Sequence, residues 1–213
     1  SGELDAATLD ISGDIDVDGT TNLDVVDVDG AANFAADVTF ATGADIITAS
    51  AGTSNVRIGV NAGNSIASGG NYNTVVGDEA GTSITTGDRN TAIGYAALDA
   101  NATTSFNTAV GYLALSAQTS GQSNVAVGDS ALSLSTSGTN CTAVGQAASA
   151  ANVEGASNTA VGRGALIADT KGSRSVAIGN STLETQNFTS ATNSNNTAVG
   201  FFAGNDITTG VNN

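Results

Sequence analysis

The chain contains no proline, tryptophan, methionine or histidine, and only 4% of its 213 residues are aromatic. The absence of histidine removes the side chain that most often serves as a general base or a metal ligand in proteins. Large side chains for a core are also scarce, because much of the 40% apolar fraction is alanine, which buries little surface. We therefore expect the chain to complete its core by assembling with copies of itself.

Basic residues are nearly as rare. The chain has five Lys and Arg against 20 Asp and Glu, a net charge of −15. This balance argues against nucleic acid or an anionic membrane as a partner, since phosphate binding needs Lys and Arg. No apolar run approaches the length of a membrane span, so we expect no membrane insertion. Cys141 is the only cysteine, which excludes a disulfide within one chain.

The first fifty residues carry eleven acidic side chains and no basic one. Ile and Val alternate with Asp over residues 14–18 and 26–29, a period-two pattern typical of a strand with one buried face. Asp-Gly closes each run as a turn signal. One chain offers too few apolar residues here to bury alone. We predict that residues 1–54 form an interwound, multi-chain β-prism shaft.

The same segment contains the front half of a calcium loop. Asp14, Asp16, Asp18 and Gly19 match the D-x-D-x-D-G pattern, but the twelfth position of such a loop is Val25 instead of Glu. A solvated strand face is therefore the favoured interpretation, and a weak cation site is the alternative. No metal or cofactor site is assigned from the sequence.

Residues 55–213 repeat one phrase, Asn-Thr-Ala-Val-Gly. Its glycine recurs nine times at spacings of 18, then six times 17, then 21 residues: Gly59, Gly77, Gly94, Gly111, Gly128, Gly145, Gly162, Gly179 and Gly200. We call these the key glycines. A short period held over nine units is the signature of a solenoid, in which each repeat is one coil stacked on the last. The sequence predicts an all-β solenoid, or β-roll, over residues 55–213.

An asparagine stands four residues before the key glycine in seven of the nine coils. Such a residue can form a stacked amide ladder or hold a bend in its own backbone. Both roles are structural. The seven are Asn55, Asn73, Asn90, Asn107, Asn124, Asn158 and Asn196, and the exceptions are Cys141 and Ser175.

Three further positions of the coil are nearly fixed. The residue before each key glycine is always Val or Ile, which predicts the apolar core stripe, Val127 included. Two residues before, alanine dominates and indicates close packing on the opposite face. Three residues before, Thr exchanges with Val, as expected of a half-buried strand position.

The part of the coil after the key glycine comes in two versions. Five coils have Leu four residues after it, whereas Gly63, Gly81 and Gly204 stand there in three others and are followed three residues later by Ile. We predict that each coil needs one large apolar group, supplied from either position. The far end of the coil, as in residues 117–120 with Gln118, is variable and predicts an exposed outer turn. The long coil before Gly200 predicts a tolerated insertion around residues 187–189, with a contact loop as the alternative.

These phrases resemble known fibre repeats. Residues 175–179, Ser-Val-Ala-Ile-Gly, resemble the YadA-like head repeats of trimeric autotransporter adhesins, and residues 107–115 are similar to repeats of phage tail-fibre proteins. The resemblance covers about three quarters of the chain. It implies a homotrimer of β-rolls interlocked into a stiff rod. The acidic segment at the start of the chain, about the first fifty residues, is similar to the shaft of viral fibres.

The favoured function is therefore a structural fibre protein of a virion, a trimeric tail or side fibre that supports host attachment outside the cell. The alternative is the passenger of a bacterial surface adhesin, and an ice-binding solenoid is remote because Val56, Val125 and Val176 interrupt the threonine row. We expect no catalytic site and no enzyme activity. The expected partners are two further copies, other virion proteins and a host glycan or protein. Since the sequence starts without Met and stops on the first residue of a tenth coil, Asn213, we expect a fragment whose receptor-binding tip follows it.

Overall fold

The computed structural model describes residues 50–213. The predicted shaft lies outside the described residues except for its last few, and so do Asp14, Asp16 and Asp18. Within residues 50–213 every regular element is a β-strand.

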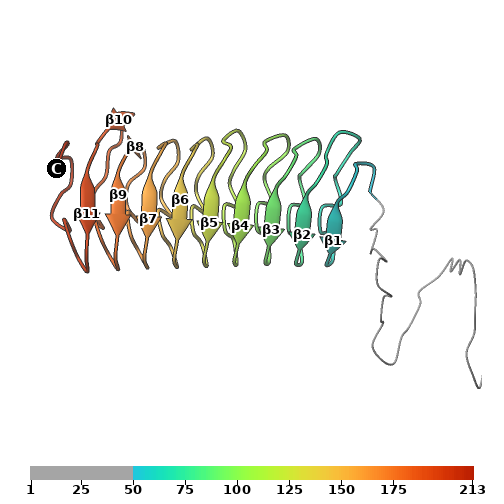
Figure 1. The fold of residues 1–213 in the computed structure, drawn as a ribbon, viewed down its shortest axis with the longest axis horizontal. Helices are drawn as coiled ribbons and strands as arrows, with labels where there is room; N and C mark the ends of the chain where they lie inside the picture. The colour runs from blue at the N-terminus through green and yellow to red at the C-terminus, as the bar shows by residue number, and fades with distance from the viewer. Residues whose placement is uncertain (1–49) are drawn as a thin grey trace, which may run out of the picture. The chain divides into compact units, whose positions relative to one another are not determined.

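Nine three-residue strands form one parallel sheet in which each strand pairs with its counterpart in the next coil. Figure 1 shows them side by side along the solenoid, all pointing the same way. This arrangement of stacked coils of about 17 residues confirms the predicted all-β solenoid. In sheet order within residues 50–213 the strands are β1 (Val56–Ile58), β2 (Thr74–Val76), β3 (Thr91–Ile93), β4 (Thr108–Val110), β5 (Val125–Val127), β6 (Thr142–Val144), β7 (Thr159–Val161), β9 (Val176–Ile178) and β11 (Thr197–Val199).

The strands pair without any slip in register. Thr108 lies opposite Val125 and Val110 opposite Val127, and the same positions match in every other pair of the sheet. A period in the sequence thus becomes a straight row of equivalent side chains along the solenoid.

The long coil forms a small second sheet. β8 (Gly172–Ser173) pairs in parallel with β10 (Thr192–Asn193), a strand that lies in the long coil. Phe188, at the centre of the predicted insertion, is buried, and its carbonyl accepts a hydrogen bond from the Lys171 N–H at 2.9 Å. The extra residues are thus bonded to the preceding coil.

The key glycines are required by the backbone. Their φ angles lie between 125° and 134°, a backbone conformation that residues with a side chain rarely adopt. A Cβ atom on Gly111 would lie 2.5 Å from the carbonyl oxygen of Gly128 in the next coil. The bend after each strand therefore fixes glycine at one position per coil.

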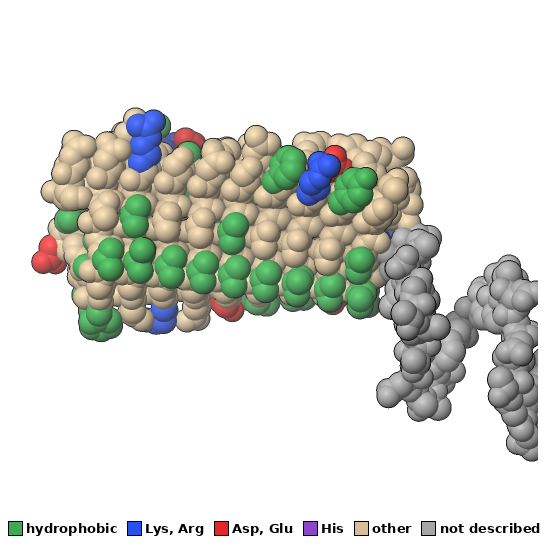
Figure 2. All heavy atoms as spheres, viewed as in Figure 1, with side chains coloured by type: hydrophobic (Ala, Val, Ile, Leu, Met, Phe, Trp, Pro, Cys, Tyr) green, Lys and Arg blue, Asp and Glu red, His purple; other side chains and the backbone are tan. Residues whose placement is uncertain are grey.

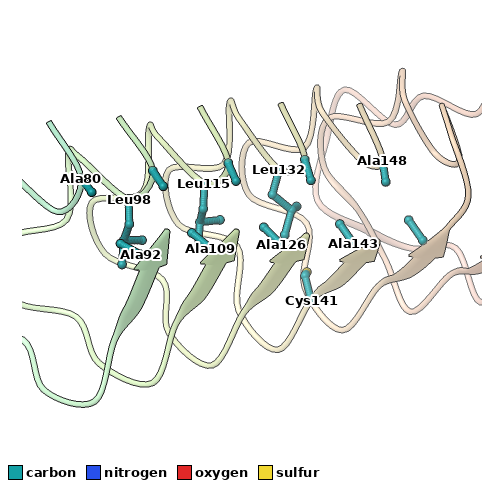
Figure 3. Close-up of a cluster of buried hydrophobic side chains, with 14 of the residues drawn as sticks. Ala80, Ala92, Leu98, Ala109, Leu115, Ala126, Leu132, Cys141, Ala143 and Ala148 are labelled. Carbon is teal, nitrogen blue, oxygen red and sulfur yellow. The ribbon is translucent and has the colours of Figure 1, made fainter. Parts of the chain in front are cut away.

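The interior of the solenoid is lined by the alanines two residues before the key glycines, and the predicted core stripe is wrong. Ala92, Ala109 and Ala126 are fully buried, whereas Ile93 is 38% exposed and Ile58 59%. In Figure 3, Leu98, Leu115 and Leu132 point from the facing side of the coil toward these alanines. The interior accommodates one large group per coil, which leaves only an alanine-sized space beside the strand.

The two versions of the coil fill the same space, as predicted. Leu98 and Ile84 are both fully buried although they come from different positions of their coils. A Cβ atom on Gly81 would lie 2.7 Å from the Ile84 Cδ1, and one on Gly63 would lie 2.8 Å from the Ile66 Cδ1. Coils with Ile thus need glycine at the earlier position.

The predicted outer turn is not an exposed turn throughout. Gln118, seven residues after its key glycine, is fully buried. At the same position Asn101, Asn152 and Asp169 accept hydrogen bonds from the backbone N–H three residues on, at 2.7–3.0 Å. The position is polar because its side chain holds a buried bend of the Asx type.

The asparagines form a row of side-chain-to-backbone hydrogen bonds that link successive coils. Each Oδ1 accepts from the backbone N–H of the equivalent residue in the next coil, as from Asn55 to Asn124, at 2.8–3.1 Å. Each Nδ2 donates to a carbonyl across the coil, such as Gly138 for Asn124 at 2.8 Å. Backbone groups that the bends leave outside the sheet are satisfied in this way.

Cys141 and Ser175 interrupt this row. The backbone N–H of each donates to the Oδ1 of the asparagine in the preceding coil at 2.9 Å, but neither side chain has an amide oxygen that could accept from the next coil. The Cys141 Sγ is 3.2 Å from the Gly155 carbonyl oxygen, where other coils place an Nδ2.

We predict opposite effects for two substitutions in the row. Asn124→Ala leaves the buried Cys141 N–H without its acceptor and the Gly138 carbonyl with only the Gln118 Nε2, at 3.3 Å, as a donor. It should lower the free energy of unfolding by roughly 1–3 kcal/mol. Cys141→Asn supplies the missing amide and should raise it by about 1 kcal/mol. Thermal and urea unfolding measure both, and equal stability of the three proteins would contradict this role for the row.

Candidate functional site

The outer face of the sheet extends over all nine coils of the described residues. We define it as the side chains one and three residues before each key glycine. Figure 2 shows the row formed by the Val and Ile residues one before the key glycines as a line of hydrophobic side chains along the solenoid. Ile58, Ile93, Val144, Ile178 and Val199 are exposed, and the other members of the row are half-buried.

Every residue of the outer face is Val, Ile or Thr, so the face carries no charge over nine coils. With strands spaced about 4.8 Å apart, it measures roughly 40 Å by 10 Å. Contiguous exposed apolar patches of a few hundred Å² mark interaction sites on soluble proteins. The outer face is therefore the first candidate interaction surface.

An aromatic and cationic cluster lies on three successive coils. Tyr72, Arg89 and Phe106 occupy the same position, five residues before the key glycine, and Tyr72 and Phe106 are about half exposed. The Arg89 Cζ is 5.3 Å from the Tyr72 ring centroid and 5.6 Å from that of Phe106. Since Arg89 stacks between the two rings, each ring has one face occupied, and the cluster stabilises the stacking of coils.

A second aromatic row follows the key glycines. Tyr95 and Tyr112 stack with ring centroids 5.6 Å apart and an interplanar angle of 14°, while Phe201 and Phe202 meet edge to face at 4.3 Å. Stacking along the solenoid axis follows from the exact register of the coils. All four rings are exposed.

The acidic side chains form no cluster in the described part of the chain. No group of three or more His, Cys, Asp or Glu there is placed to hold a metal ion. Asp169 is buried and accepts from the Gly172 and Phe188 N–H groups and from the Gln186 amide. Glu154 pairs with Lys171 at 3.0 Å on the surface, which contributes little stability. The expectation that the chain has no catalytic residue stays a prediction.

Burial raises the pKa of Asp99, against the opposing effect of hydrogen bonds from the Asp99 and Ala100 N–H groups, and nearby Glu79 raises it further. The Asp99 Oδ1 is buried without a hydrogen-bond partner. The ionised carboxylate is therefore disfavoured in the folded chain.

A raised folded-state pKa makes the protein most stable where Asp99 is protonated. As the pH rises from below the ordinary value of 3.8 through the raised value, this contribution to stability is lost. Asp99→Asn should therefore melt at a higher temperature than the wild type at neutral pH, with the gap closing in acid. Melting curves from pH 3 to 7 test this, and a gap that widens in acid would contradict it.

The Cys141 thiol has no sign of a reactive role. Its burial raises its pKa, with opposing hydrogen bonds from the Asn158 backbone, the Asn152 side chain and the Ser157 backbone. Reactive thiols have lowered pKa values and access to solvent. Cys141 is a packing residue in the asparagine row.

The comparisons with known proteins identify no relative. No family model, curated protein or solved structure matches the chain. Within the part of the chain that the structure describes, no helix is long and apolar enough to cross a membrane.

Proposed function

We propose that the chain is a segment of a homotrimeric fibre in which the outer faces of three solenoids pack against one another along the fibre axis. The observation that carries this proposal is the uncharged outer face, whose Val and Ile row includes exposed members from Ile58 at one end to Val199 at the other. Burying it would remove apolar surface from water at about 25 cal/mol per Å².

A second copy of the chain fits this face better than an unrelated partner. The face repeats with the period of the coils, and an identical solenoid presents the same period over the same length. When copies associate symmetrically, every coil of one chain can therefore pack against the equivalent coil of another. The scarcity of large side chains in the sequence supports the same conclusion, and the resemblance to fibre repeats supports three copies instead of two.

The proposed role is mechanical. A stack of coils joined by backbone hydrogen bonds and asparagine bonds forms a stiff spacer, suited to the tail or side fibre of a virion that holds a receptor-binding part away from the particle. Other virion proteins would attach it. A bacterial surface adhesin, which needs the same stiffness, is the alternative.

We predict that the purified chain has three times the mass of one chain in light scattering or native mass spectrometry. A stable monomer or a dimer would contradict the proposal. A monomer that shapes growing ice crystals would instead favour the remote ice-binding alternative, which also uses a flat regular face.

Substitution of the outer face should separate assembly from folding. Val127 is half-buried in one chain, so Val127→Asp should leave the β-rich circular dichroism spectrum of the chain intact and yet abolish the trimer, since three charges would be buried together. The matched control is Thr103→Asp, at an exposed position on the far turn, which should remain trimeric. Equal assembly of both variants would place the interface elsewhere.

A further inference from the structure

A hollow of about 140 Å³ opens between the coils that begin at Gly145, Gly162 and Gly179. It is lined by Gln146, Ala147, Arg163, Gly164, Ile167, Ser181 and Glu184. All of these residues follow key glycines, so they belong to the bend beyond the strands and not to the outer face defined above.

Gly164 creates the hollow. It stands two residues after its key glycine, with φ of 65°, but Ala147 and Ser181 hold the same position at 54° and 51°, and Leu113 does so at 51°. The backbone there does not require glycine. A Cβ atom on Gly164 would meet only the Ser181 Oγ, at 3.6 Å. The missing side chain is therefore what leaves the space.

The walls combine hydrogen-bond donors, acceptors and apolar surface. The Arg163 Nε donates to the Gln146 Oε1 at 3.3 Å, which leaves the other guanidinium N–H groups to donate further. Glu184 contributes a carboxylate, an acceptor only, and Ile167 and Ala147 contribute apolar surface. Pockets that bind small molecules combine apolar walls with a few polar groups in this way.

We propose that this hollow binds one ring of a neutral sugar, a hexopyranose. A cavity of about 150 Å³ accommodates one benzene ring, so the hollow has room for a single six-membered ring. A sugar hydroxyl is both donor and acceptor, and Glu184 and Arg163 together offer both counterparts. An acidic sugar would face the Glu184 carboxylate and the net charge of −15.

The proposal goes beyond the proposed fibre function, since it places a ligand site within the coils. It needs residues of one chain only, so it stands or falls independently of the trimer. In a homotrimeric fibre that reaches a cell surface, one such site on each chain would supply three weak contacts at the same level of the solenoid.

Saturation-transfer NMR on the whole chain tests the proposal. The probes are methyl α-glucopyranoside, methyl α-mannopyranoside and methyl β-galactopyranoside, with open-chain mannitol and the acidic N-acetylneuraminic acid as comparisons. At least one neutral pyranoside should give a signal well above that of mannitol. A signal from none of the three, or from the acidic sugar alone, would overturn the proposal.

Variants at one position of the coil locate the site. Gly164→Leu fills the hollow with the residue that Leu113 already places on the same backbone, and it should reduce the pyranoside signal to the mannitol level. Ser130→Leu makes the equivalent change two coils away, where Ser130 has φ of 56°, and should leave the signal unchanged. Glu184→Gln should weaken binding, since an amide oxygen accepts less strongly than a carboxylate. A signal that survives Gly164→Leu, or is lost equally in Ser130→Leu, would contradict the assignment.

Discussion

The structure depends on the hydrogen bonds that join each coil to the next in exact register. Backbone N–H groups bond to carbonyls one coil away not only in the strands but also through the bends, as Ala96 does to Asp78 and Leu98 to Ala114. This bonding leaves no freedom to slip by one residue, because a slip would exchange the two faces of every strand. The glycine at each bend and the asparagine before each strand follow from this close stacking. Glycine leaves room for the backbone of the next coil, and asparagine bonds backbone groups that lie outside the sheet, so both recur in successive coils.

Much of the fold could be predicted from the sequence because the period is short and nearly constant. The key glycines, the asparagine row and the exchange of Leu for Gly and Ile each reflect one local requirement, which the residue type reveals. The direction of the strand side chains could not be predicted as easily. Size alone suggested that Val127 lies inside and Ala126 outside, but Leu132 enters the interior from the facing side of its coil and leaves room only for alanine.

The same error concealed the candidate interaction surface. Val and Ile before each glycine share a strand face with the Thr or Val two residues earlier, and the repeated Thr could have indicated that this face meets solvent or a partner. Gln118 was misjudged for a related reason, because a variable polar position suggests exposure, whereas here different polar side chains hold a buried bend. The hollow is indicated in the sequence only by Gly164, which stands at a position where the other coils carry a side chain.

One coil of the solenoid is packed less well than its neighbours, which the composition does not reveal. The coil that begins at Gly145 lacks the large interior side chain, since the buried Ser149 stands where its neighbours have Leu132 and Leu166, and the Cys141 that leads into it breaks the asparagine row. In a one-dimensional stack each coil is stabilised only by its neighbours, so a weak coil divides the stack into blocks that unfold separately. Under tension along the solenoid axis, the stack would open first at this coil, and the blocks on either side would stay folded and able to close again.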